Sequence, residues 1–295
     1  MGVDLRQQRF GAHLSIAGGL PNALIEARRI GCDCLQVFVK NQRQWSARPL
    51  SDEEIDAWQA AQTDRVRPVV AHNTYLVNLA SANEETRRKS LEATTDELTR
   101  CERLGIPYLV MHPGSHGGKG EAAGLRAIVQ GLDEVLRRTE GGSVQALLET
   151  TAGQGNALGY RFEHLADILE RVREPDRLNV CVDTCHIFAA GYELRCPDGY
   201  AETMGRLDET VGIERVRWIH VNDSKGQLGS RLDRHEHIGM GQIGRAGFEH
   251  LVNDARLVNV PKILETPKGT DAKGRDLDKV NLQRLRRLIR KRPTG

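Results

Sequence analysis

Eight short apolar runs rich in β-formers alternate with helix-like stretches along this chain, and that alternation is what most restricts its fold. The helix-like stretches include residues 22–30, 85–105 and 160–173, with a last one at 281–292. Strands separated by helices form βαβ units with a parallel sheet, and eight at a spacing of roughly 30 residues imply a closed barrel. We therefore predict an α/β fold, a (β/α)8 TIM barrel, as a single domain over residues 1–295. The strand-like runs are residues 10–16, 34–39, 67–72, 108–112, 145–150, 178–186, 216–223 and 261–266.

The composition agrees with one such domain. The chain has 295 residues, 39% of them apolar and 28% charged, which is ordinary for a soluble globular protein. It contains no apolar run of 18 residues and its first residues lack the apolar core of a signal peptide, so we expect a cytoplasmic protein without a membrane span. The six cysteines form no CxxC pair, which favours reduced thiols. A net charge of +2 neither supports nor excludes a nucleic-acid partner.

Reactive side chains gather at the ends of the predicted strands. Every run except the second carries His, Asp or Glu at or near its C-terminal end, and the second leads into the polar loop KNQRQW. In a TIM barrel the active site lies at that end of the strands, so these groups should share one rim. One histidine at a strand end is more often structural than a ligand, but convergence of all of them indicates a site. The reactive residues at the ends of the predicted strands are His13, His72, His112, Glu149, Asp183, His220 and Glu265.

Two further pairs extend this set. Asp183 and His186 are three residues apart at a strand end, and Asp233 and His235 are two apart, so that both can face one side of an extended loop. Imidazole and carboxylate donors suit zinc, and also manganese or iron. A catalytic zinc usually takes three protein ligands, so a set this large suits two or three ions. Clustered ions are the machinery of phosphodiester hydrolysis.

Other catalytic motifs are missing. The segment HPGSHGGKG lacks the spacing and the Ser/Thr of a phosphate-binding P-loop, and no GxSxG nucleophile elbow occurs. The segment ETTAGQG is either a plain turn or a loop whose glycines let the backbone approach a ligand.

Nine separated segments together resemble the endonuclease IV family, the zinc-dependent apurinic/apyrimidinic endonucleases of the AP endonuclease 2 type. They run from residue 11 to residue 268, in the order found in that family. A match over so many motifs is highly specific. The segments are GAHLSIAGGL, KNQRQW, HNTYLVNLAS, HPGSH, ETTAGQG, VDTCHIFAAGY, HVNDSK, RLDRHEHIGMGQIG and LETPK.

The resemblance implies three zinc ions per chain and a role for each donor; manganese in some of the sites is an alternative. It places His72, His112 and Glu149 on the first zinc. The second zinc takes Asp183, His220 and Glu265, with Glu149 as a bridge. His186, Asp233 and His235 would hold the third, and Glu149 and Glu265 would be the catalytic carboxylates.

The implied activity is a DNA-repair hydrolase, a deoxyribonuclease acting in base excision repair. It would cut the phosphodiester 5′ to an abasic site, leaving a 3′-hydroxyl and a 5′-deoxyribose phosphate, and would trim blocked 3′ ends. The partner would be double-stranded DNA bearing such lesions, and the enzyme a monomer. Arg43, Tyr75 and Leu76 match positions that enter the duplex; a surface arginine and a packed Tyr-Leu pair are the plainer interpretation. His13 lies outside the ligand set.

Two other functions remain open from the residues alone. A sugar isomerase or epimerase on a related barrel also places His, Asp and Glu on this rim, but it holds one or two divalent ions. It would need neither Asp233 and His235 nor the segment NQRQW. A non-catalytic binder of DNA lesions with a structural metal cluster is the other alternative.

Overall fold

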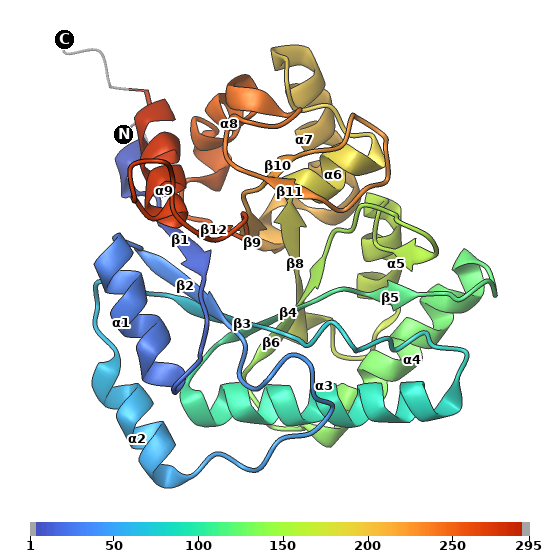
Figure 1. Ribbon diagram of the computed structural model, residues 1–295. Helices are drawn as coiled ribbons and strands as arrows, with labels where there is room; N and C mark the ends of the chain where they lie inside the picture. The colour runs from blue at the N-terminus through green and yellow to red at the C-terminus, as the bar shows by residue number, and fades with distance from the viewer. Residues whose placement is uncertain (1–3, 291–295) are drawn as a thin grey trace.

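The computed structural model describes residues 4–290, and its centre is a closed barrel of eight parallel strands (Figure 1). Around the barrel the order is β1-β12-β9-β8-β6-β4-β3-β2, and every neighbouring pair is parallel. This confirms the predicted fold class. The barrel strands are β1 Phe10–His13, β2 Cys34–Val37, β3 Val69–His72, β4 Tyr108–Met111, β6 Gln145–Glu149, β8 Leu178–Asp183, β9 Val216–His220 and β12 Lys262–Leu264.

Helices surround the strands and bury an apolar layer against them (Figure 1). Long amphipathic helices have local signals at their ends. Asn83 caps the N-terminus of α3, for example, and Gly105 ends that helix in the left-handed conformation. The helices are α1 Leu20–Ile30, α2 Asp52–Ala61, α3 Glu84–Leu104, α4 Glu121–Arg138, α5 Phe162–Arg171, α6 Thr184–Ala190, α7 Pro197–Val211, α8 Gly244–Val252 and α9 Leu277–Leu288.

One layer of apolar side chains fills the inside of the barrel. Seven buried residues, one from each strand except β1, form this layer, with Tyr108 packed against it. In β1 the equivalent position is Gly11, where a Cβ would lie only 1.9 Å from the carbonyl oxygen of Cys34. A side chain there would therefore collide with the neighbouring strand β2. The seven layer residues are Cys34, Val70, Val110, Leu147, Cys181, Trp218 and Ile263.

Two small antiparallel sheets lie outside the barrel. One pairs β5 Gly114–Ser115 with β7 Ala157–Leu158, and the other pairs β10 Asp223–Ser224 with β11 His235–Glu236. The second sheet ties the predicted ligand His235 to the segment that follows β9. Among residues 4–290, no helix combines the length and apolarity that a membrane crossing requires.

The predicted elements differ from the observed ones mainly at their ends. The run at residues 178–186 is wrong as a single strand, because β8 ends at Asp183 and α6 begins at Thr184. The Asp183 carboxylate accepts a hydrogen bond of 2.9 Å from the backbone N–H of His186 and so caps the new helix. The last predicted helix begins earlier, at Leu277, and residues 291–292 of that prediction lie outside the described residues.

Candidate metal centre

The candidate site occupies the next inward-facing layer of the barrel. Because strand side chains alternate in direction, the residue two positions beyond each apolar layer residue also faces inward. Those positions bring together seven of the polar side chains at the C-terminal mouth of the barrel, and Gly11 is followed in the same way by His13. They are Gln36, His72, His112, Glu149, Asp183, His220 and Glu265.

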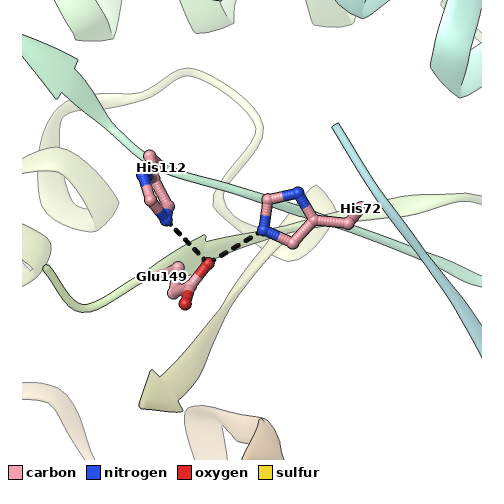
Figure 2. A group of neighbouring side chains, drawn as sticks. All are labelled: His72, His112 and Glu149. Carbon is pink, nitrogen blue, oxygen red and sulfur yellow. Dashed lines mark hydrogen bonds and ion pairs between the residues drawn. The ribbon is translucent and has the colours of Figure 1, made fainter. Parts of the chain in front are cut away.

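A first donor group consists of His72, His112 and Glu149, and their ligand atoms lie within 4.8 Å of one another. Figure 2 shows the Glu149 carboxylate between the two imidazoles, with its Oε2 3.1 Å from His72 Nε2 and 3.2 Å from His112 Nε2. The other ring nitrogen of His72 donates to the carbonyl oxygen of Asn73 at 2.7 Å. A histidine held in this way presents its free nitrogen lone pair to a metal.

A second donor group shares Glu149 and adds Asp183, His220 and Glu265. Nδ1 of His220 lies 2.9 Å from Glu149 Oε1, 3.3 Å from Glu265 Oε2 and 3.9 Å from Asp183 Oδ2. Its Nε2 donates to the Gln36 side-chain oxygen at 2.7 Å. The ring is therefore fixed with one nitrogen toward three carboxylates and the other toward an amide.

The third donor group lies at the start of α6 and in the segment around β11. The ligand atoms of Asp183, His186 and His235 fall within 4.8 Å of one another. Asp233 lies beside them, with its Oδ1 3.2 Å from His186 Nε2 and 3.4 Å from His235 Nε2. Asp183 Oδ2 is 3.7 Å from His235 Nε2, so Asp183 faces both this group and the second one. The sequence did not indicate that sharing.

The third group fits a metal ion by an observation on its two histidines. Nε2 of His186 and Nε2 of His235 are buried and have no hydrogen-bond partner within residues 4–290, and both face the Asp233 carboxylate. Nδ1 of each ring is bonded to a backbone carbonyl, Thr150 O at 2.8 Å and Glu265 O at 3.1 Å. Buried polar atoms normally have partners, so a cation is the natural occupant of the space between them. Nitrogen and oxygen donors suit zinc, manganese or iron.

The buried histidines and carboxylates of the cluster shift one another's pKa values. Burial by itself would raise the pKa of Glu149, but His220 and His112 outweigh it and hold that pKa well below its usual range. Burial likewise opposes charge on His186 and His220, yet the neighbouring negative groups raise the pKa of both well above the usual value. Cations are therefore stabilised at this mouth, whether protons or metal ions.

Three supporting residues were missed by the sequence analysis. Asn222 donates to Asp183 Oδ2 at 2.7 Å and accepts from the backbone N–H of Glu265 at 2.7 Å. The Thr150 hydroxyl accepts from the backbone N–H of Asp183 at 2.9 Å. Gln36 donates to Glu265 Oε1 at 2.6 Å. Gln36 was detectable, because it stands two residues after Cys34 in the one strand that seemed to lack a polar end.

His13 belongs to the same mouth without joining a donor group. Its Nδ1 lies 3.1 Å from Glu265 Oε1 and 2.9 Å from Gln36 Nε2, and its ring packs against Phe38 at 4.4 Å between centroids. Burial lowers the pKa of His13 despite the nearby Glu265. A neutral histidine that supports Glu265 agrees with its place outside the predicted ligand set.

The three predicted DNA-contact residues lie on two loops beside this mouth. Tyr75 is 56% exposed and Leu76 is 36% exposed. The centroid of the Tyr75 ring lies 5.0 Å from the centroid of the His72 ring. Arg43 is exposed in a turn that Asn41 closes through bonds to the backbone N–H groups of Arg43 and Gln44. Large side chains are thus presented to solvent next to the donor groups.

Two hollows lie at opposite ends of the barrel. One of about 710 Å³ opens beside the donor groups, and Phe38, Tyr75 and Glu265 are among its lining residues. Another of about 1070 Å³ is lined by Tyr108, Trp218 and others and contains none of the donor residues. Of these two hollows, only the first is lined by a donor residue, Glu265, so the first is the place for a substrate.

Known proteins resemble this chain along nearly its whole length. The family model described as xylose isomerase-like TIM barrel matches residues 24–288. A protein of Chloroflexus aggregans named probable endonuclease 4 is 53% identical over 283 residues, covering 96% of this chain and 98% of that protein. Another of the same name, from Geobacter sulfurreducens, is 46% identical and covers 97% and 96%.

Solved structures also resemble this chain over nearly its whole length. The structure of endonuclease IV from Thermus thermophilus superposes with a TM-score of 0.83 at 38% identity, covering 95% of this chain and 98% of that one. A D-tagatose 3-epimerase-like protein has a TM-score of 0.71 at 20% identity, covering 95% and 97%. At that identity the likeness to the epimerase-like protein concerns the fold alone.

Proposed function

Because this chain belongs to the endonuclease IV family, we propose that it is a DNA-repair endonuclease that hydrolyses the phosphodiester bond 5′ to abasic sites. The products would be a 3′-hydroxyl and a 5′-deoxyribose phosphate. The observation that carries the proposal is the set of three adjoining donor groups, joined by Glu149 and Asp183, at a barrel mouth beside two exposed loops. The names of its relatives support an endonuclease and not a sugar epimerase.

We assign three zinc ions to the three donor groups. Zinc bound there would activate water and neutralise the negative charge that develops on the phosphate and the leaving oxygen. The residues of the first group would be His72, His112 and Glu149. Those of the second would be Glu149, Asp183, His220 and Glu265, and those of the third His186, Asp233 and His235.

The chain itself contributes orientation and charge. Glu149 is fully buried and faces histidines of all three groups, so its carboxylate is the natural bridge. Glu265 is held by Gln36 at 2.6 Å and by His13 at 3.1 Å, which restricts its rotation. Preorganised charges of this kind stabilise a transition state without having to reorganise during the reaction. We therefore keep Glu149 and Glu265 as the catalytic carboxylates.

Recognition of the lesion would come from the two loops. Tyr75, Leu76 and Arg43 present exposed large side chains that can fill the gap left by a displaced nucleotide. Displacement costs least where a base is already missing, since neither stacking nor pairing of that base is lost. The hollow of about 710 Å³ beside Tyr75 and Glu265 offers room for the sugar.

The test is incision of a duplex carrying one tetrahydrofuran abasic analogue, beside an identical duplex with a normal nucleotide at that position. We expect a single cut 5′ to the analogue and no cut in the normal duplex. Removal of metal should abolish the cut and zinc should restore it. Absence of incision by metal-replete protein would refute the proposal.

Metal analysis separates this function from its alternatives. About three zinc ions per chain would support the endonuclease, whereas one or two manganese ions and turnover of a ketose would support an epimerase. Binding of the lesion without incision would indicate a non-catalytic lesion binder.

Trimming of 3′-phosphate ends, a monomeric state and a cytoplasmic location stay predictions of the same proposal. End-labelled oligonucleotides, light scattering and cell fractionation, respectively, would check them.

A further inference from the structure

Both loops predicted to read DNA rest on one face of helix α3. We name residues 40–48, which contain Arg43, the arginine loop, and residues 73–77, which contain Tyr75 and Leu76, the tyrosine loop. The two loops follow neighbouring strands, β2 and β3. Helix α3 comes later in the chain and lies beside both loops (Figure 1). Its side chains Asp96 and Glu97 bond to Lys40 and to the backbone of Thr74.

Glu97 of α3 bonds to both loops with one carboxylate. Its Oε1 lies 3.2 Å from Nζ of Lys40, at the start of the arginine loop. Its two oxygens accept from the backbone N–H of Thr74 in the tyrosine loop, at 3.4 and 3.2 Å. The side chains of Glu97 and Lys40 are each only 1% exposed. A single buried group therefore fastens two segments that are far apart in sequence from it.

The surrounding contacts join the loops further. Lys40 Nζ also donates to the Trp45 carbonyl oxygen at 3.1 Å, across the base of the arginine loop. The Thr74 hydroxyl donates to the Gln42 carbonyl oxygen at 2.5 Å, a direct bond from one loop to the other. Arg100 of α3 holds the far end of the arginine loop through the Arg48 carbonyl oxygen. The tips that carry Arg43 and Tyr75 remain exposed.

Such a buried ion pair is costly to maintain in a fold. Taking both charges out of water costs several kcal/mol, and their attraction recovers this only with good geometry and further hydrogen bonds. Burial raises the pKa of Glu97 to about 7 even with Lys40 beside it. Apolar side chains could fill the space under the loops, but they would supply no acceptor for the Thr74 N–H. The carboxylate is suited to fixing backbone position.

We propose that Glu97 is a positioning residue that holds the arginine and tyrosine loops in one register, so that Arg43 and Tyr75 engage damaged DNA together. This rests on the proposed function for its DNA step. Its structural step, that both loops are ordered by Glu97, holds without any DNA. Among the described residues, Glu97 has no hydrogen bond or ion pair to the nine donor residues, so its removal should act first on the loops and on DNA binding.

The experiment compares Glu97→Gln with Glu85→Gln, the same substitution at an exposed position of the same helix. Amide hydrogen exchange of the DNA-free proteins reports loop order. We expect faster exchange in both loops of Glu97→Gln and in neither loop of Glu85→Gln. With tetrahydrofuran duplex, KM should rise about tenfold because ordering the loops is then left to binding. The single-turnover rate at saturating DNA should change less than KM does.

A milder variant guards against global unfolding of Glu97→Gln. Thr74→Ala removes the hydroxyl bond to Gln42 but leaves the Lys40–Glu97 pair, and it should raise KM in the same direction with unchanged zinc content. Unchanged exchange in either loop of folded Glu97→Gln would overturn the proposal, as would unchanged KM for an active enzyme. Failure of the wild-type protein to incise would count against the proposed function instead, and the exchange data would still test the ordering of the loops.

Discussion

Replacing Gln36 by Met probes the metal centre through a residue that is not itself a proposed ligand. Gln36 is fully buried in β2. Its side-chain oxygen accepts from His220 Nε2 at 2.7 Å, and its Nε2 donates to Glu265 Oε1 at 2.6 Å. Methionine has a similar length and volume, so the substitution removes the amide and largely keeps the packing.

The expected loss follows from those two bonds. Each joins the amide to an ionisable group, and hydrogen bonds to charged partners contribute about 1.5–3 kcal/mol. Burial of the apolar thioether recovers roughly 1 kcal/mol. The free energy of unfolding of the metal-free protein should therefore fall by about 2–5 kcal/mol. The Glu265 carboxylate and the His220 ring would also lose their fixed orientation, which should weaken zinc binding by about 10–100-fold.

Chemical denaturation of the metal-free protein and zinc competition with a chelator of known affinity measure the two effects separately. Gln59→Met, on the exposed side of α2, is the matched control and should change neither. If Gln36→Met binds zinc within twofold of wild type and unfolds at the same denaturant concentration, the orienting role of Gln36 is wrong.

Three further predictions concern other parts of the protein. Glu149→Gln should abolish incision but leave binding of the tetrahydrofuran duplex measurable by fluorescence anisotropy; retained incision would disprove the bridging role. Lys262 is buried, and burial lowers its pKa from 10.5 to about 7. Between pH 7 and about 10.5 the unfolded chain therefore keeps a proton that the folded protein has lost, so this group makes the free energy of unfolding rise with pH. This rise, about 1.4 kcal/mol per pH unit, should be absent from the Lys262→Met variant in chemical denaturation at a series of pH values. The same pH dependence of the free energy of unfolding in variant and wild type would contradict the prediction. Gly11→Ala should destabilise by about 3 kcal/mol or more in thermal unfolding, because its Cβ would meet a backbone oxygen, whereas Gly205→Ala, with open space around it in α7, should be neutral or stabilising.

The barrel and the polar rim could be predicted from the sequence because both depend on local patterns. Apolar runs, helical spacing and a polar residue at each strand end are properties of neighbouring residues, and the parallel strands bring their ends to one face. In the barrel strands from β3 to β12, an apolar residue of the inner layer is followed two positions later by a donor. Val70 and His72 are the first such pair, and Ile263 and Glu265 are the last. The sequence also indicated the endonuclease IV family, which the comparisons confirmed.

The family resemblance implied which donors belong together, but only the tertiary structure decided how they are held and that Asp183 faces two groups. Gln36 meets His220 and Glu265 across 184 and 229 residues of chain, and Glu97 meets Thr74 from a later helix. No local pattern specifies such pairs, since they depend on barrel closure and on where each helix packs. His186 joins the third group because Asp183 ends a strand by capping a helix. The strand ends thus identify the donors, and closure of the barrel determines which of them share a site.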